Sequence, residues 1–149
     1  LRCRRVMEAG AGRGYLAAAL APRLAARGMA FLAVEKARGA YDQGLPVHPL
    51  VQSGDALIAV HRWQPDCLLY AWPPPGKSLV PLCRPPWVRY VLVLGEPGGG
   101  CTGDPEDWAR LAHRVLPSLS RLSWARSGRH RQSATLFYGA GHPAWQDPG

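Results

Sequence analysis

The stretch Val6–Leu16, with the sequence VMEAGAGRGYL, decides how this chain folds. A short apolar run ends in an acid, three alternating glycines follow, and the apolar residues of a helix come next. Glycine has no Cβ and adopts positive φ angles readily, so such a turn lets the backbone approach a ligand closely. The first turn of the helix adds N–H groups that have no partner within the helix. We therefore predict a strand, a glycine turn and a helix in immediate succession, and we take the turn as the candidate ligand site.

Length and composition indicate one domain that spans residues 1–149. Apolar residues make up 47% of the chain, which excludes a disordered protein, and no run approaches the roughly 18 to 20 apolar residues of a membrane helix. The first strand begins almost at Leu1, so we expect no signal peptide and an intracellular protein. The four cysteines have no zinc-site spacing and the histidines no metal spacing, so we expect reduced thiols and no metal site.

Alternating apolar and polar segments predict the order of the elements. Strands are predicted at residues 4–9, 29–35, 47–52, 66–72, 87–94, 119–124 and 133–138. Helices are predicted at residues 14–27 and 56–63 and from Pro105 to near Pro117, with Asp104 as the N-cap, and only a brief helix between residues 77 and 87. Strands that alternate with helices favour a mostly parallel sheet with helices on both faces, which is an α/β fold. The last two strands are predicted to form an antiparallel pair.

The polar candidates all lie at the ends of predicted strands. Ligands of such sheets bind beyond the carboxyl ends of the strands, next to the first strand. The residues found at these ends are Glu8, Glu35, Asp55, Trp72 and Glu96. We therefore expect them to gather at one edge of the sheet.

The glycine turn has three interpretations. A dinucleotide site of a nicotinamide or flavin oxidoreductase requires Gly-x-Gly-x-x-Gly, whereas here the third glycine, Gly14, comes one residue early. Glu8 would also repel a pyrophosphate. A tight turn without a ligand is the second interpretation. The third is a different cofactor, because Glu35 stands 21 residues after Gly14, where an acid binds the hydroxyls of a ribose. Asp55 is placed either to accept a hydrogen bond from an adenine amino group or to cap the next helix.

This set of residues resembles the class I S-adenosylmethionine-dependent methyltransferases. The matching residues are Glu8, Gly10, Gly12 and Gly14 in the first motif, Glu35 in the second, and Gly54, Asp55 and Ala56 in the third. The resemblance implies a Rossmann-like methyltransferase fold with S-adenosyl-L-methionine as cofactor. It further implies that the glycines lie under the methionine part, that Glu8 approaches the ammonium group and Glu35 the ribose, and that Asp55 and Ala56 face the adenine.

The fourth motif departs from the pattern of enzymes that methylate amino groups of nucleobases. Those enzymes place Asp, Asn or Ser before Pro-Pro and then an aromatic residue, whereas this chain has Trp72, Pro73, Pro74 and Pro75. Trp72 has a donor and no good acceptor, so its expected role is stacking on a base, lining the cofactor site or plugging the end of the strand. The Trp-Pro-Pro segment is similar to that of a little-characterised methyltransferase-like group. The similarity extends to the later run Gly95-Glu96-Pro97-Gly98-Gly99-Gly100-Cys101-Thr102-Gly103-Asp104. The resemblance places Trp72, Pro73, Pro74 and Glu96 at the catalytic end of the site, with Glu96 as a base or an orienting group and Cys101 as a loop thiol or a nucleophile.

The charge favours an anionic partner. The formal net charge is +8, and the densest basic cluster comprises Arg121, Arg126, Arg129, His130 and Arg131. Such a surface binds the phosphates of RNA or is a solvated loop, and RNA in a ribonucleoprotein assembly is the first expectation. Three functions stay open: a methyltransferase, a catalytically inactive scaffold module of the same fold, and a nicotinamide-type oxidoreductase.

Overall fold

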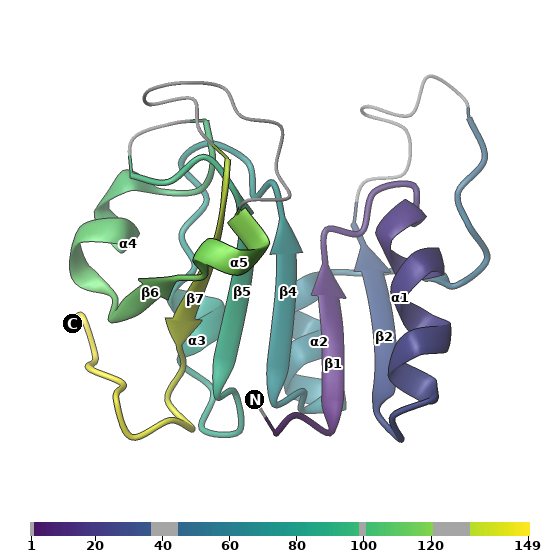
Figure 1. The fold of residues 1–149 in the computed structure, drawn as a ribbon, viewed down its shortest axis with the longest axis horizontal. Coiled ribbons are helices and arrows are strands. Elements are labelled where there is room, and N and C mark those ends of the chain that lie inside the picture. The colour runs from purple at the N-terminus through teal and green to yellow at the C-terminus, as the bar shows by residue number, and fades with distance from the viewer. Residues whose placement is uncertain (1, 37–44, 99–100, 121–131) are drawn as a thin grey trace.

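A seven-stranded, mostly parallel sheet forms the centre of the protein (Figure 1). The structure, a computed structural model, describes residues 2–36, 45–98, 101–120 and 132–149. The strands are β1 (Arg5–Ala9), β2 (Ala30–Glu35), β3 (Val51–Ser53), β4 (Cys67–Ala71), β5 (Tyr90–Gly95), β6 (His113–Val115) and β7 (Ser133–Tyr138). Their order in the sheet is β3-β2-β1-β4-β5-β7-β6. The first five pair in parallel, β7 is antiparallel to β5, and β6 is antiparallel to β7.

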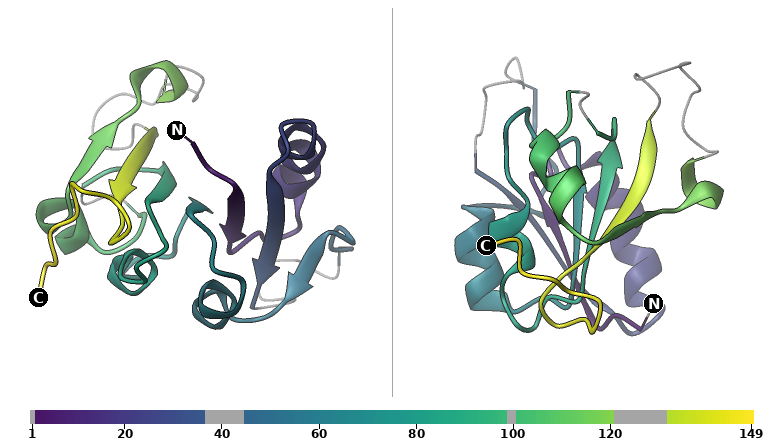
Figure 2. Two further views of the ribbon diagram at one scale, coloured as in Figure 1. Left: turned by 90° about the horizontal axis from the view of Figure 1, so that it is seen from below. Right: turned by 90° about the vertical axis from the view of Figure 1, so that its left-hand side faces the viewer.

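Helices cover both faces of the sheet (Figure 2). They are α1 (Tyr15–Ala25), α2 (Ala56–Trp63), α3 (Val80–Cys83), α4 (Pro105–Arg110) and α5 (Pro117–Ser120). Because side chains alternate along a strand, each strand contributes to two separate cores. One core joins Met7, Leu68 and Val91 to α2, α3 and α4, and the other joins Val6 and Tyr90 to Leu24 of α1. We call these the α2 face and the α1 face of the sheet.

The predicted α/β class, with a mostly parallel sheet, helices on both faces and antiparallel strands at the C-terminal end, is confirmed. The helix after β3 has the predicted bounds, and Asp55 is its N-cap. The third strand is shorter than predicted. Only Val51–Ser53 is a strand, because residues 47–50, which include Pro49, run outside the ladder before the backbone meets β2.

The prediction for the C-terminal part was wrong in two places. The helix that begins at Pro105 ends at Arg110, because the backbone of the buried Leu111 is extended. The residues after it form β6, which pairs with β7, and Pro117 then starts the short α5. The predicted strand at residues 119–124 is therefore wrong for residues 119–120, which belong to α5, and residues 121–124 lie outside the described ranges. The antiparallel partners of β7 are β5 and β6 instead.

This topology brings the carboxyl ends of β1, β2, β4 and β5 to one edge of the sheet (Figure 1). Glu35 is the last residue of β2, while Trp72 and Glu96 directly follow β4 and β5. The predicted gathering of these residues at strand ends is confirmed. In the parts of the chain that the structure describes, each helix is too short or too polar to cross a membrane.

Candidate functional site

The glycine turn is tied to the end of β2 by a hydrogen bond. The backbone N–H of Gly12 donates to Oε2 of Glu35 at 2.7 Å, and that of Ala11 donates to the carbonyl of Val34 at 3.1 Å. Gly12 has φ +53°, and a Cβ there would meet no heavy atom within 4 Å. The turn thus presents open space at Gly12 and a carboxylate beside it, which is a cradle for a group that donates hydrogen bonds.

Gly14 serves the packing of the fold. It is the N-cap of α1 with φ +84°, and a Cβ there would lie 2.6 Å from Cγ2 of Val51 and 2.8 Å from Cβ of His48. The turn and the segment before β3 approach so closely that only glycine fits. The close contact between two parts of the chain therefore explains why the third position of the motif has to be glycine.

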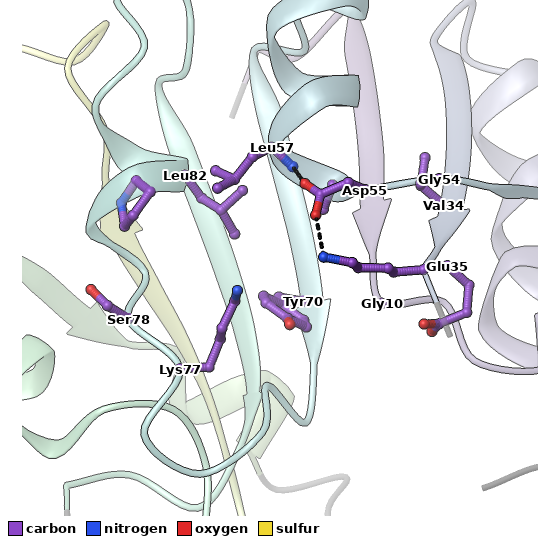
Figure 3. A pocket seen from close by; sticks show the side chains of 13 residues that line it. Gly10, Val34, Glu35, Gly54, Asp55, Leu57, Tyr70, Lys77, Ser78 and Leu82 are labelled. Carbon is purple, nitrogen blue, oxygen red and sulfur yellow. Dashed lines mark hydrogen bonds and ion pairs between the residues drawn. The ribbon is translucent and has the colours of Figure 1, made fainter. Parts of the chain in front are cut away.

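A cavity lies on the α2 face beside Gly10 of the glycine turn (Figure 3). Its volume is about 110 Å³, and we call it the α2-face cavity. The predicted residues that line it are Gly10, Glu35, Asp55 and Ala56. Figure 3 shows the Tyr70 ring between Lys77 on one side and Glu35 and Asp55 on the other. Three motifs that are far apart in the sequence thus meet in one cavity.

Both carboxylate oxygens of Asp55 are engaged. Oδ1 accepts from the N–H of Leu57 at 2.8 Å, which caps α2, and Oδ2 accepts from Nζ of Lys36 at 3.0 Å. The hydrogen bond from Lys36 holds the pKa of Asp55 below its ordinary value. The capping alternative from the sequence is therefore confirmed. An adenine amino group at Asp55 would have to share or replace the contact with Lys36.

Glu8 is the most unusual acid of the site. It is only 2% exposed, and its Oε2 is buried with no hydrogen-bond partner among the described residues. Burial, with the nearby charge of Glu35 as the second cause, raises its pKa to about 7. Alternation along β1 turns Glu8 to the α1 face, together with Val6. A buried, unpaired carboxyl beside a second carboxylate is a site that a cation stabilises.

The Trp-Pro-Pro segment is held to the glycine-rich loop after β5. The carbonyl of Pro73 accepts from the N–H of Gly103 at 2.9 Å, and the carbonyl of Gly103 accepts from the N–H of Gly76 at 2.9 Å. Pro74 forms the turn whose carbonyl accepts from Lys77 at 3.0 Å. Pro73 and Pro74 thus shape the loop, and the two unusual motifs of the sequence form one structural unit.

Trp72 does not line the α2-face cavity. Its φ is +55°, a left-handed conformation that bulky residues rarely adopt, and its side chain is 46% exposed. It lines a hollow on the α1 face of the sheet, together with Leu69 of β4 and Leu94 of β5.

Glu96 lies in the loop after β5 and is bound within it. Its Oε2 accepts from the N–H of Cys101 at 3.0 Å, and its own N–H donates to Oγ1 of Thr102 at 3.0 Å. The carboxylate is nearly buried and is absent from the lining of the α2-face cavity, whereas Cys101 is exposed. Glu96 therefore organises this loop and lies outside the α2-face cavity, while its place at the catalytic end of the site stays a prediction.

Sequence reasoning missed several residues of the cavity. Lys36, Tyr70, Lys77 and Ser78 all line it. The position of Lys36 directly after the acid at the end of β2 was a signal that could have identified it. Tyr70 was also identifiable, because it alternates with Leu69 along β4 and so faces the opposite side of the sheet.

Comparison with known proteins identifies the fold. No protein-family profile matches the chain, and no curated protein sequence matches it significantly. Among solved structures, the CMeT domain of the citrinin polyketide synthase is similar with a TM-score of 0.53 and 12% identity over 94% of this chain. Human N-acetylserotonin methyltransferase in complex with S-adenosylmethionine gives a TM-score of 0.52 and 10% identity over 92% of this chain. The chain spans about half the length of these proteins, 47% and 48%. At this identity the likeness concerns the fold, which is the Rossmann-like fold of methyltransferases.

Proposed function

We propose that this chain is a methyltransferase domain that binds S-adenosyl-L-methionine across the carboxyl ends of β1, β2 and β4. The observation that carries the proposal is the unpartnered oxygen of Glu8, buried beside a second carboxylate. A cofactor with an ammonium group and a sulfonium centre supplies the missing positive charge. It also has no phosphate for these acids to repel.

Each part of the cofactor has a candidate partner in the chain. Glu8 would bind the methionine ammonium, and Glu35, which lines the α2-face cavity, would accept hydrogen bonds from the ribose hydroxyls. Asp55 and Ala56 line the same cavity at the start of α2 and would face the adenine. The open space at Gly12 leaves room for the cofactor to pass between the two acids.

The cofactor supplies an activated methyl group. Glu8, Glu35 and Asp55 would hold the cofactor, and it would give this methyl group to the lone pair of an acceptor, with the carbon–sulfur electrons left on sulfur and the acceptor's proton passed to water. The contribution of the chain is to hold the two reactants in line, which by itself accounts for several kcal/mol of many barriers.

The oxidoreductase alternative fits these contacts poorly. A pyrophosphate at the turn requires free N–H groups, whereas the N–H of Gly12 donates to Glu35. Glu8 would also place a buried carboxyl near two phosphates. Preferential binding of NAD over S-adenosylmethionine would revive this alternative.

Binding measurements test the proposal. Titration calorimetry of the purified chain with S-adenosylhomocysteine is expected to give saturable binding. Glu35→Ala and Glu8→Gln should each weaken it at least tenfold, since each loses a charge-assisted hydrogen bond. Glu106→Gln, an exposed acid in α4, is the matched control and should bind normally. No binding by the folded wild-type chain would refute the proposal.

A catalytically inactive module is the second candidate function. Trp72 offers no acceptor to a methyl-accepting amine, and Glu96 is bound to Cys101. The same protein preparation decides between the two, with tritiated S-adenosylmethionine and RNA and protein extracts as acceptors. Binding without transfer favours a scaffold, and transfer favours the enzyme.

RNA is the proposed macromolecular partner. The cluster that includes Arg126, Arg129 and Arg131 lies outside the described residues, so its support remains the net charge of +8.

A second basic group lies at the opposite edge of the sheet. The N–H groups of Arg4 and Arg5 donate to the carboxylate of Asp66, and the N–H of Arg89 donates to its carbonyl. The Arg5 guanidinium lies 4.4 Å from the centre of the Trp63 ring. If RNA binds here, the fluorescence anisotropy of a labelled RNA should show an affinity that falls steeply with salt concentration. Arg4→Gln should reduce the slope of log affinity against log salt by about one. Salt-independent binding would indicate a protein partner.

A further inference from the structure

The hollow beside Trp72, which we call the α1-face groove, has a volume of about 380 Å³. Its apolar walls come from α1, β4, β5 and α5 and include Leu16, Leu20, Leu69, Trp72, Leu92 and Leu119. Figure 1 shows α1 and α5 in front of the sheet with β4 between them. Leu69 faces this groove, while the next residue, Tyr70, faces the α2-face cavity. The two hollows therefore lie on opposite sides of β4 and share the edge where that strand ends.

The chemistry of the groove indicates an uncharged occupant. None of the described residues that line it carries a charge. Its hydroxyl groups are already engaged, because Oγ of Ser120 donates to the carbonyl of Leu116 at 2.9 Å and Oγ of Ser133 bonds to Oγ1 of Thr135 at 3.1 Å. A charged group would lose its hydration here and find no opposite charge among these lining residues. Aromatic or alkyl groups gain the most from these walls.

The backbone of Trp72 gives the second, independent indication. A left-handed conformation costs a non-glycine residue about 1 to 2 kcal/mol. Trp72 is 46% exposed, so about half of its surface is available to a ligand. Residues held in such conformations cluster at ligand-binding positions, where the surrounding structure fixes them. Here the N–H of Trp72 donates to the carbonyl of Leu94 at 2.8 Å, which holds the turn at the rim of the groove.

We propose that the α1-face groove binds the uncharged aromatic or alkyl part of the methyl acceptor, which packs against the Trp72 indole. This inference rests on the proposed methyltransferase function. It adds the chemical class of the acceptor and the face from which the acceptor approaches. The acceptor enters from the α1 face and meets the methyl group over the shared edge of β4, while the adenosine of the cofactor occupies the α2-face cavity.

A fluorescent probe tests the groove directly. N-phenyl-1-naphthylamine is uncharged, has aromatic rings and fluoresces in apolar surroundings. The full chain is expected to bind it saturably, and Trp72→Gly should raise its dissociation constant about tenfold or more. Ile58→Ala removes another exposed apolar side chain, 55% exposed against 46% for Trp72, from the opposite face and should leave probe binding unchanged.

The thermal stability of the same variant separates a ligand-binding role from a structural one. Glycine relieves the strain of φ +55° while the packing of the half-exposed indole is lost, so the two effects should largely cancel and Trp72→Gly should shift the melting temperature by only a few degrees. A clear drop would show that Trp72 is a structural plug and would overturn the proposal, as would undiminished probe binding. If the probe fails to bind while S-adenosylhomocysteine binds, the groove proposal alone fails. If neither binds, the methyltransferase proposal fails as well.

Discussion

Two turns at the same edge of the sheet adopt left-handed backbone conformations by different means. The turn after β1 uses glycine at 10, 12 and 14, each with positive φ. The turn after β4 uses Trp72 with φ +55°, where glycine would be the ordinary choice. The first turn is therefore explained by local geometry and packing. The second places a bulky residue where the backbone would favour glycine, which calls for a role of the Trp72 side chain.

The largest loss of stability is expected from a substitution at one position of the glycine turn, Gly14. Gly14→Val places a β-branched side chain at φ +84° and its Cβ within 3 Å of Val51 and His48. Strain and overpacking together should lower the free energy of unfolding by about 4 kcal/mol in urea denaturation. Gly12→Ala is the matched control, because its Cβ meets nothing within 4 Å, and it should cost about 1 kcal/mol. Equal losses at the two positions would show that the turn matters for conformation alone.

The charge before the glycine turn should give the next largest effect. The pKa of Glu8 is about 7 in the folded chain, against an ordinary value of 4.5, so the folded state binds the proton more tightly. Stability should therefore fall as the pH rises from 4.5 to 7, by up to about 3 kcal/mol for a difference of this size. Urea denaturation at pH 5 and pH 8 measures this change, and Glu8→Gln should remove it. The turn after β4 begins with an uncharged residue and should contribute no such dependence.

Binding of a cation to Glu8 has the opposite pH dependence. A bound ammonium group favours the ionised carboxylate, so binding releases a proton below pH 7 and affinity should rise with pH up to that value. Calorimetry of S-adenosylhomocysteine in two buffers with different ionisation enthalpies detects the released proton. Affinity that stays constant between pH 5.5 and pH 8 would exclude Glu8 as the partner of the ammonium group.

The sequence predicted the elements whose signals are local. The strand–turn–helix at Val6–Leu16, the N-cap at Asp55 and the acid at the end of β2 all depend on residues close in the chain, and the structure places them as expected. Parallel strands then bring these ends together, since their directions are the same. The cavity residues Glu35 and Asp55 were accordingly accessible to sequence analysis.

The features that the sequence did not predict depend on contacts between distant segments. The role of Gly14 depends on its contacts with Val51 and His48. The strand β6 forms because three of its residues pair with the free edge of β7. The face to which Trp72 turns depends on a φ angle that its residue type disfavours. Propensity favours the common conformation at such a position, so the exception appears only once the fold is known.

The smallest expected effect concerns the ion pair at the mouth of the α2-face cavity. Lys36→Met keeps the aliphatic stem and removes the contact with Asp55, an exposed pair of a kind worth about 0 to 1 kcal/mol. S-adenosylhomocysteine should then bind about threefold more tightly in calorimetry, because the adenine no longer competes with the ammonium group of Lys36 for Asp55.

The pKa of Asp55, followed by NMR, should rise toward its ordinary value in the Lys36→Met variant, because the hydrogen bond from Lys36 is the main cause of its lowering. Lys77→Met changes a cation on the other side of Tyr70 and should leave the pKa of Asp55 unchanged. Weaker binding after Lys36→Met would instead make Lys36 a ligand-binding residue.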